Sequence, residues 1–324
     1  MNETSALKQE KSRGIPSEGS PKGALNGMTK IFSLAVLLLG LISPPGGDEK
    51  SVIRFPSGPE IDLAAAVLEP GGVLLAKWRP GPEVKKMNIR FGEAAYESIN
   101  EGGDGALFAL IGLDLALEPG PHDLKAAVVF QDGRIEEVKY PLMIQSRDFP
   151  VRNLRVKQEF VTPPPELEER IRWEAELLQM VYSVSDEKWL GEGAFEWPHP
   201  GESARNFGER RVYNGIPRSS HSGLDIAAPL GSPVRASNSG RVVLARDLYF
   251  SGNTVILDHG LGIFTVYCHF SRLMVTRGQS VKKGDSLALA GSTGRSTGPH
   301  LHWAVRIRGS RVDPEALLRL SLPN

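Results

Sequence analysis

The chain has 324 residues, which is enough for about two domains plus tails. Its 38 Lys and Arg side chains balance 38 Asp and Glu side chains, so the composition lacks the basic excess that marks nucleic-acid-binding proteins. The same balance excludes steering onto an anionic polymer as the main source of affinity.

An uncharged apolar run stands near the N-terminus. The run extends from Ile31 to Ser43, and two prolines and two glycines follow it, so the whole segment covers residues 31–47. Its length is typical of a signal-peptide core and is shorter than the ~20 residues that a membrane-spanning helix needs. Residues 1–30 form a polar tail, and two interpretations stay open. Either translation starts at Met28 and a signal peptide follows, or the tail is cytoplasmic and the run is an uncleaved anchor.

Residues 50–148 show the pattern of a small β-domain. Apolar or alternating runs at 72–78, 106–112 and 124–130 are separated by turn signals rich in Pro and Gly. This spacing is typical of a β-sandwich, and we expect an immunoglobulin-like fold. The domain holds no cluster of charged residues or histidines, so we expect a spacer or a partner-binding surface.

A linker with one helix is predicted over residues 149–200. A run of prolines precedes an acidic first turn, and apolar residues then recur at steps of three and four. This pattern indicates an amphipathic helix over residues 165–182. We expect its apolar stripe to pack against a neighbouring domain. The stripe consists of Leu167, Ile171, Ala175, Leu178 and Val181.

Histidines concentrate in the C-terminal segment, residues 201–324. Those in the segment are His221, His259, His269, His300 and His302. His300 and His302 are two residues apart in a β-rich stretch, so both imidazoles project from one strand face. A catalytic zinc site typically has three protein ligands and keeps a fourth position for water. Further histidines beside such a site would serve as acid, base or transition-state donors.

The run Ile263–Phe270 is predicted to be a strand with one polar face. We expect Tyr267 and His269 on this face and Cys268 on the opposite, apolar face with Phe270. Tyr267 then either donates a hydrogen bond to a reaction intermediate or packs at the rim of a groove. Cys268 is predicted to be a small buried side chain that does not bind metal.

These residues also admit other interpretations. His259 lies in a hairpin-turn signature, so a structural role is favoured. Two histidines and one carboxylate also bind iron in non-haem oxygenases. Such a site gives no role to the additional histidines, so we favour zinc.

The C-terminal motifs resemble those of the lysostaphin/LytM-type zinc metallopeptidases, which cut peptide bonds in bacterial cell walls. The resemblance covers roughly residues 201–316. It rests on an H-x-G-x-D motif at His221, a Tyr-x-His strand ending at His269, and a Gly- and Ser-rich run leading into H-x-H at His300. It implies an antiparallel β metallopeptidase domain over residues 201–324.

The resemblance also implies a role for each site residue. In that family, the first His and the Asp of H-x-G-x-D and the second His of H-x-H bind zinc. One Zn²⁺ per chain would thus be held by His221, Asp225 and His302. The strand histidine and the first histidine of H-x-H, here His269 and His300, would form the catalytic pair.

The implied function is zinc-dependent hydrolysis of peptide cross-links or stem peptides of bacterial peptidoglycan. We expect an exported protein of the periplasm or cell envelope, anchored to the inner membrane only if the apolar segment is uncleaved. The N-terminal β-domain would then contact the wall or a cell-envelope partner. Some relatives that lost zinc ligands activate wall amidases without catalysis. A non-enzymatic regulator of this kind is the alternative function.

In some relatives an upstream segment occupies the open metal position. Glu192, Glu196 or His199 would be available for this role here. Deleting the residues before Gly201 would then raise activity. The other interpretation of His199, which lies between two prolines, is a linker residue.

Overall fold

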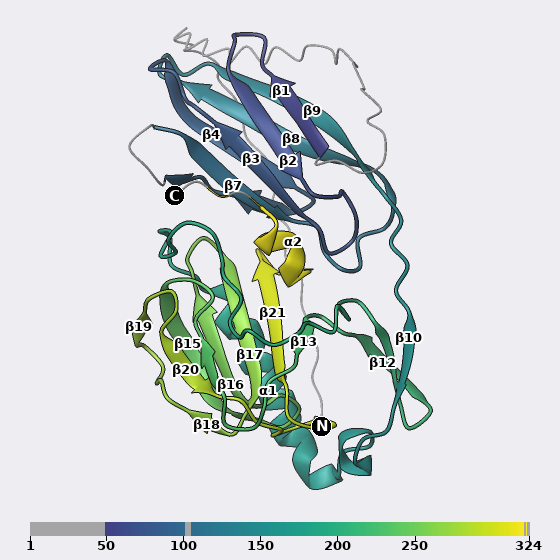
Figure 1. Cartoon of the computed structure of the whole chain (residues 1–324). Helices are drawn as coiled ribbons and strands as arrows, with labels where there is room; N and C mark the ends of the chain where they lie inside the picture. Colours follow the sequence, from purple (N-terminus) through teal and green to yellow (C-terminus); the bar gives the residue numbers. More distant parts are fainter. Residues whose placement is uncertain (1–48, 101–104, 321, 323–324) are drawn as a thin grey trace, which may run out of the picture. The chain divides into compact units, whose positions relative to one another are not determined.

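The computed structural model describes residues 49–100, 105–320 and 322, which Figure 1 shows in colour. The polar tail expected over residues 1–30 and the apolar segment 31–47 lie outside the described residues. No described helix is both long and apolar enough to cross a bilayer. The described part is mainly β, as the sequence predicts.

The N-terminal region is a sandwich of two antiparallel sheets (Figure 1). One sheet has the strand order β1-β2-β3-β7-β6 and the other β5-β4-β8-β9. The strands are β1 (Glu49–Arg54), β2 (Glu60–Ala65), β3 (Val73–Trp78), β4 (Val84–Phe91), β5 (Ala94–Tyr96), β6 (Ile99–Asn100), β7 (Leu107–Gly112), β8 (Gly120–Phe130) and β9 (Ile135–Ile144).

The strand order confirms the expected immunoglobulin-like fold. Strands β2, β3, β7 and β6 follow the order A-B-E-D of a constant-type immunoglobulin sheet, and β4, β8 and β9 follow C-F-G. Alternating apolar residues of both sheets meet in the core, where Leu63, Phe108 and Phe130 are almost fully buried.

The C-terminal domain is built on an antiparallel sheet with the order β13-β21-β17-β16-β15-β19, and β22 pairs with β21. Its strands are β13 (Leu224–Ile226), β15 (Gly240–Leu248), β16 (Gly252–Asp258), β17 (Ile263–Phe270), β19 (Ser280–Val281), β21 (Leu301–Ile307) and β22 (Ser310–Val312). Short helix α2 (Pro314–Leu318) follows.

Two small sheets accompany it, with the orders β10-β11-β12 and β14-β20-β18. They comprise β10 (Val151–Leu154), β11 (Arg210–Tyr213), β12 (Ile216–Ser220), β14 (Pro233–Arg235), β18 (Arg272–Leu273) and β20 (Ser286–Leu289). Strand β10 lies in the segment expected to be a linker, and it pairs in parallel with β11. The sequence did not predict this strand.

The connecting helix forms close to its expected position. A 3-10 turn, η2 (Pro165–Leu167), leads into α1 (Glu168–Ser183), and another, η1 (Gln158–Phe160), precedes both. Proline suits this start, because it lacks the N–H that a first turn leaves unpaired.

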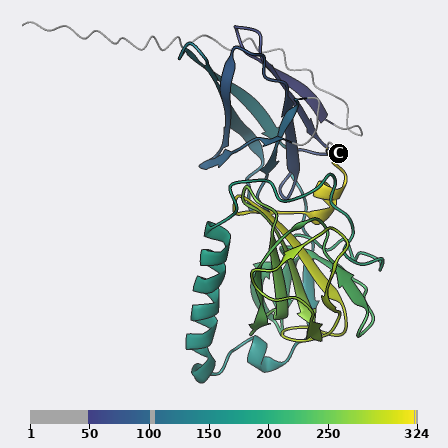
Figure 2. The same ribbon diagram turned by 90° about the vertical axis from the view of Figure 1, so that its left-hand side faces the viewer.

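One face of α1 packs on the main sheet of the C-terminal domain (Figure 2). Leu178 and Val181 lie against the apolar cluster on this sheet face, as predicted. The sequence also predicts Ala175 in the stripe, but Ala175 is exposed. Glu174 is buried instead, because its carboxylate accepts hydrogen bonds from Arg170 Nε (2.6 Å) and from the backbone N–H of Tyr249 (2.8 Å).

A β-bulge interrupts β17 at His269. Phe270 pairs with Asn253 and Tyr267 with Val255, so β17 has one residue more than β16 between these pairs. His269 has a φ of 68°, a left-handed conformation that residues other than glycine rarely adopt. The extra residue reverses the alternation of side chains, so the expectation of a shared face for Tyr267 and His269 is wrong.

The segment before the C-terminal domain, expected to be a linker, packs against it. Phe195 is only 4% exposed and belongs to the main apolar core. The ring of Trp197 lies 5.9 Å from that of Trp303. Backbone hydrogen bonds also join this segment to the domain, and in one of them the N–H of Glu196 donates to Ser237 O (2.9 Å). Residues 188–200 therefore cover part of the core.

Candidate metal centre

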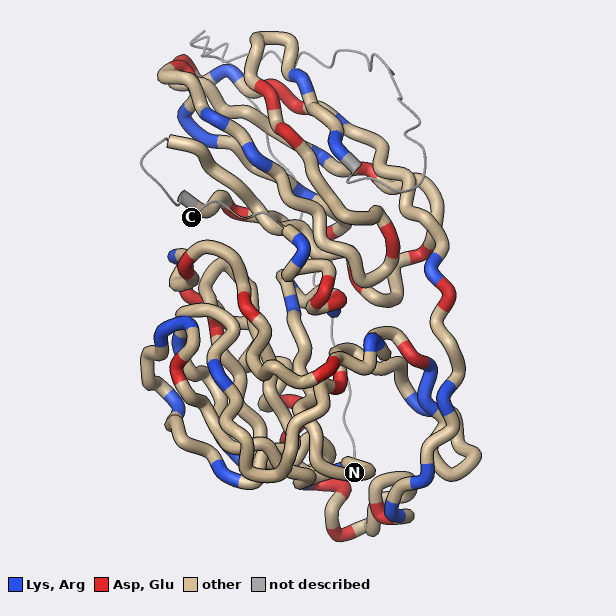
Figure 3. Tube along the Cα trace, viewed as in Figure 1, with Lys and Arg blue, Asp and Glu red and all other residues tan. Residues whose placement is uncertain are grey.

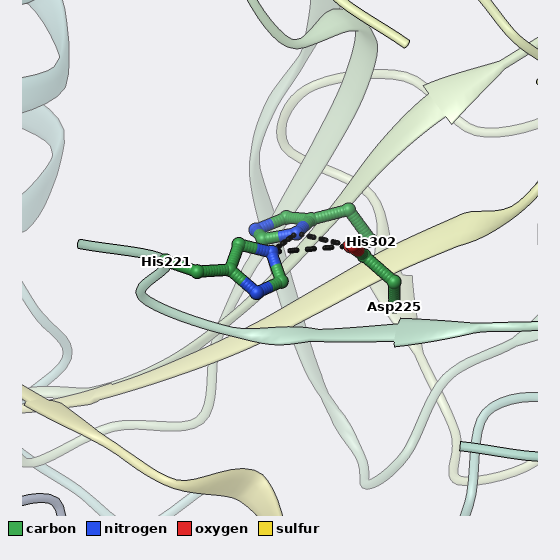
Figure 4. A group of neighbouring side chains, drawn as sticks. All are labelled: His221, Asp225 and His302. Carbon is green, nitrogen blue, oxygen red and sulfur yellow. Dashed lines mark hydrogen bonds and ion pairs between the residues drawn. The ribbon is translucent and has the colours of Figure 1, made fainter. Parts of the chain in front are cut away.

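Three side chains converge on one point, and Figure 4 shows them. His221 Nε2 lies 2.8 Å from His302 Nδ1, and each nitrogen lies 3.1 Å from Asp225 Oδ1. In the described part of the chain, these residues form the only group of three or more His, Cys, Asp or Glu side chains that could hold a metal. The three residues predicted as ligands are thus brought together.

The pairing of two strands fixes two of these residues. Asp225 on β13 is paired directly with His302 on β21, and directly paired residues project from the same sheet face. His221 lies just before β13. Gly223 lies between His221 and Asp225 in the sequence. A Cβ atom built on Gly223 would be 2.5 Å from Trp303 O and 2.9 Å from His302 Cε1. Only glycine allows this close approach.

A second set of residues orients the first. His221 Nδ1–H donates to Asn206 O (3.0 Å), which leaves Nε2 with a lone pair directed at the centre. The other carboxylate oxygen of Asp225 accepts hydrogen bonds from Asn206 Nδ2 (2.9 Å) and Arg211 Nη2 (2.7 Å). Asn206 and Arg211 were not predicted from the sequence, because they lie 14 or more residues from Asp225 and no local motif marks them.

The protonation states suit a cation. Burial raises the pKa of Asp225, but its hydrogen bonds to His221 and His302 outweigh burial and hold the pKa well below its usual range. Burial lowers the pKa of His302, and its bond to Asp225 opposes this only in part. An ionised carboxylate and a neutral imidazole are the forms in which these side chains bind metals.

His269 and His300 stand beside this group. Their rings are 4.8 Å apart, and the ring of His269 is 6.1 Å from that of His302. His269 Nδ1–H donates to Thr293 O (2.7 Å), and His300 Nδ1–H donates to Gly298 O (2.8 Å). Both partners lie in the Gly- and Ser-rich loop 291–298. Burial, together with the nearby histidines His300 and His302, lowers the pKa of His269 to about 3.

The bulge in β17 is what brings His269 to this position. Cys268 is paired with His302, and therefore lies on the same sheet face as His302. Tyr267 is paired with Trp303 on the opposite face. In a regular strand, His269 would project with Tyr267, away from the sheet face that carries His302. The expectation that Cys268 lies opposite His269 is therefore also wrong, although Cys268 is buried as predicted.

Tyr267 and His259 have structural roles. The Tyr267 hydroxyl is fully buried, accepts from the backbone N–H of Ser237 (3.0 Å) and lies 2.9 Å from Thr265 Oγ1. His259 is also fully buried in its turn, where Nδ1–H donates to Ser239 O (2.7 Å). The packing role of Tyr267 and the structural role of His259 are the interpretations that fit these contacts.

The upstream residues considered as inhibitors make other contacts. His199 is buried, and its Nε2 lies 3.0 Å from Ser232 Oγ. Glu192 and Glu196 bind the domain through their backbone N–H groups. Among the described residues, no hydrogen bond or ion pair joins any of the three to the metal-binding group.

The donor set fits a zinc ion. Two imidazole nitrogens and one carboxylate oxygen converge on one point, where a single cation would be within reach of all three. Three ligands of these types, with further histidines outside the set, are the pattern of catalytic zinc sites. His221, Asp225 and His302 would hold the ion.

Comparison with known proteins assigns the domain. Residues 219–314 match the family model described as Peptidase family M23. The chain is similar to peptidoglycan DD-endopeptidase ShyA of Vibrio cholerae serotype O1, with 42% identity over 109 residues, 33% of this chain and 25% of that protein. It is also similar to DD-carboxypeptidase/endopeptidase Mpg of Neisseria meningitidis serogroup B, with 45% identity over 94 residues, 29% of this chain and 22% of that protein.

A solved structure matches over a larger part of the chain. It belongs to a Pseudomonas aeruginosa protein assigned to peptidase family M23, with 29% identity and a TM-score of 0.60. The match covers 78% of this chain and 95% of that one, and so extends beyond residues 219–314. By contrast, the chain spans about a quarter of the length of the two curated relatives.

Proposed function

Because residues 219–314 form a domain of peptidase family M23, we propose that the protein is a zinc-dependent endopeptidase of bacterial peptidoglycan. Its substrates would be peptide cross-links or stem peptides. The observation that carries the proposal is the convergence of His221, Asp225 and His302 beside two further histidines. The relatives named as peptidoglycan endopeptidases support the choice of substrate.

The proposed mechanism assigns separate tasks to the two groups of residues. His221, Asp225 and His302 would bind one Zn²⁺, which supplies Lewis-acid activation of water and of the scissile carbonyl. His269 and His300 each donate Nδ1–H to a backbone carbonyl, so each Nε2 is left to accept or donate a proton in the site. They would take the proton of the attacking water, stabilise the oxyanion, or protonate the leaving amine.

The neutral state of His269 favours a role as a hydrogen-bond acceptor, because an imidazole of such low pKa is a weak base. Its low pKa, about 3, keeps the imidazole neutral at physiological pH. The bulge that turns it toward His300 is a strained feature, and strain of this kind is concentrated at functional sites. Thr293 O holds the neutral ring in one tautomer, with the proton on Nδ1.

The proposed substrate requires export. We therefore propose a periplasmic or cell-envelope location, with residues 31–47 acting as a signal peptide or as an inner-membrane anchor. The immunoglobulin-like sandwich would contact the wall or a cell-envelope partner. Detection of the mature N-terminus by mass spectrometry of the cell-derived protein distinguishes cleavage from anchoring.

Digestion of purified peptidoglycan tests the proposed activity. The full chain is incubated with the polymer, then with a chelator, and then with added zinc, and the fragments are analysed by mass spectrometry. Loss of cross-linked dimers that stops with chelator and returns with zinc supports the proposal and identifies the bond. Intact peptidoglycan in the presence of the zinc-loaded chain contradicts it and favours a non-enzymatic regulator.

A further inference from the structure

A basic sheet adjoins the metal centre. Strands β10, β11 and β12 carry arginines and no acidic residue, and Figure 3 shows Lys and Arg recurring along them. The arginines are Arg152, Arg210, Arg211 and Arg218. This local excess contrasts with the zero net charge of the chain. No single stretch of sequence shows the whole patch, because β10 is distant in sequence from the hairpin formed by β11 and β12.

Arg211 connects this sheet to the metal centre. Its Nη2 donates to Asp225 Oδ2 (2.7 Å), whereas its buried Nε has no hydrogen-bond partner in the described part of the chain. The nearest acid on that side is Glu209, whose Oε2 lies 4.0 Å from Nε. The guanidinium is therefore only partly satisfied within the protein.

Arg295 approaches the same place from the loop 291–298. Its guanidinium lies 4.5 Å from the ring centre of Tyr213 and 4.8 Å from that of Phe250. Tyr213 interacts electrostatically with both Arg211 and Arg295. In the described residues, no carboxylate forms an ion pair with Arg295, which is half-buried. The same loop holds His269 through Thr293 O, two residues before Arg295.

The positive charges at this place repel one another. Burial lowers the pKa of Arg295, and the charges of Arg211 and Arg218 lower it further. The side chain of Arg218 is held in position, because its Nη2 donates to Val161 O. Guanidinium groups remain protonated in proteins, and whereas Arg211 is paired with Asp225, no described carboxylate forms an ion pair with Arg218 or Arg295. An anion would relieve the repulsion, and a carboxylate fits the planar donor edge of arginine.

We propose that Arg295, supported by Arg211 and Arg218, binds a free carboxylate of the peptide substrate close to the scissile bond. The preferred substrate is then an acidic peptide, and Arg295 determines specificity for it. This inference rests on the proposed function, since it places the subsite beside a peptidase centre. Stacking on Tyr213 and Phe250 orients the Arg295 guanidinium before the carboxylate arrives.

Hydrolysis of matched substrates tests the specificity. The full zinc-loaded chain is given a cross-linked stem-peptide dimer with free carboxylates and the same dimer with these groups amidated. We expect Arg295→Gln to lower kcat/KM for the acidic dimer by about 10- to 100-fold, the loss for one charged hydrogen bond, and to change the amidated dimer little. Arg295→Lys should retain part of the preference, because it keeps the charge without the planar edge. An equal loss on both dimers, or no loss on either, overturns the proposal.

A control and a binding measurement complete the test. Arg277→Gln removes the same charge from an exposed position and should leave both substrates unaffected. Calorimetry measures the affinity of the chain for the free-acid and the amidated stem peptide, and so tests the carboxylate subsite independently of catalysis. If the zinc-loaded chain cleaves neither dimer, the proposed hydrolysis fails. Acid-selective binding that depends on Arg295 would then still support the subsite, and equal binding of both peptides would overturn it.

Discussion

At the scale of single residues, the metal centre depends on close approach at Gly223. An added Cβ would come 2.9 Å from His302 Cε1 and 2.5 Å from Trp303 O, closer than ordinary contacts allow. We expect Gly223→Ala to displace His302 and weaken zinc binding by at least about tenfold, in the range seen for losses of ligand orientation. Competition with a zinc-sensitive dye measures this affinity.

A matched glycine provides the control. Gly298 lies near the same centre, but a Cβ built there meets no atom within 4 Å. Gly298→Ala should therefore bind zinc as tightly as the parent chain. Equal zinc affinities for the Gly223 and Gly298 variants would show that the close approach at Gly223 does not shape the site.

His259 makes stability depend on pH. Burial lowers its pKa from 6.5 to about 4, while the unfolded chain retains the ordinary value. Below pH 6.5, His259 binds a proton in the unfolded state but not in the folded state. The contribution of neutral His259 to folding stability is therefore present above this pH and is lost as pH falls toward 4. Its neighbours are uncharged: Ser239 O, Thr265 Oγ1 and the ring of Phe195. We expect a loss of roughly 2 kcal/mol by pH 5 from this group.

Denaturation of the metal-free chain at pH 7.5 and pH 5 measures this effect. Removal of metal with a chelator eliminates zinc release as a second source of pH dependence. His259→Gln cannot titrate, so the fall in unfolding free energy between the two pH values should be smaller in this variant. The same fall in both proteins would assign the pH dependence to other groups.

The grouping of the three expected ligand residues was predictable from sequence, whereas their supporting residues were not. Short sequence motifs mark these residues: H-x-G-x-D contains His221 and Asp225, and H-x-H contains His302. Asn206 and Arg211 act only because β11 and the preceding turn lie against β13 in the folded chain. Contacts set by tertiary packing leave no periodic signal in one sequence.

Among the secondary-structure elements, β17 is the one in which strict alternation does not predict every side-chain direction. Strict alternation places Phe264, Val266 and Cys268 on one face, and the contacts with the cluster under α1 agree. A bulge adds one residue to the strand, and the sequence of side chains does not predict the position of this bulge. The alternation therefore fails at His269 and Phe270, where the chain turns a histidine toward the metal ligands.

Helix α1 is anchored by a buried carboxylate. Glu174 is 6% exposed and accepts hydrogen bonds from Arg170 and from the N–H of Tyr249. Glu174→Gln keeps the shape but sets a donor against a donor, so we expect the unfolding free energy to fall by about 1–3 kcal/mol. Glu176→Gln, on the exposed face of the same helix, should change it little. Urea denaturation compares the two, and equal values would contradict the anchoring role.

At the scale of the whole molecule, the C-terminal domain extends upstream of its recognisable motifs. The sequence predicts a domain boundary at residue 201, but Phe195 and Trp197 pack on its core and α1 covers one face of its sheet. Composition alone marks this segment as a linker, because its prolines and glycines give no regular period. Its role follows from burial, which depends on the completed sheet.

Truncation tests this extended domain. A fragment of residues 165–324 should fold cooperatively, whereas residues 201–324 should lose more than about 3 kcal/mol, because removal of one buried Phe alone costs that much. Activity of the shorter fragment should fall with its stability. If residues 201–324 are instead equally stable and more active, the upstream segment restrains the enzyme and does not support it.

The proposed activity, cleavage of peptidoglycan cross-links, depends on one zinc ion bound by His221, Asp225 and His302. The most direct test is a titration of zinc into the metal-free full chain while the loss of a purified cross-linked stem-peptide dimer is followed. We expect activity to rise to one equivalent of zinc, to vanish together with zinc binding in His302→Ala, and to vanish with zinc still bound in His300→Ala. A chain that binds one zinc and leaves the dimer intact, or a His302→Ala variant that still cleaves it, would contradict the proposed zinc-dependent activity.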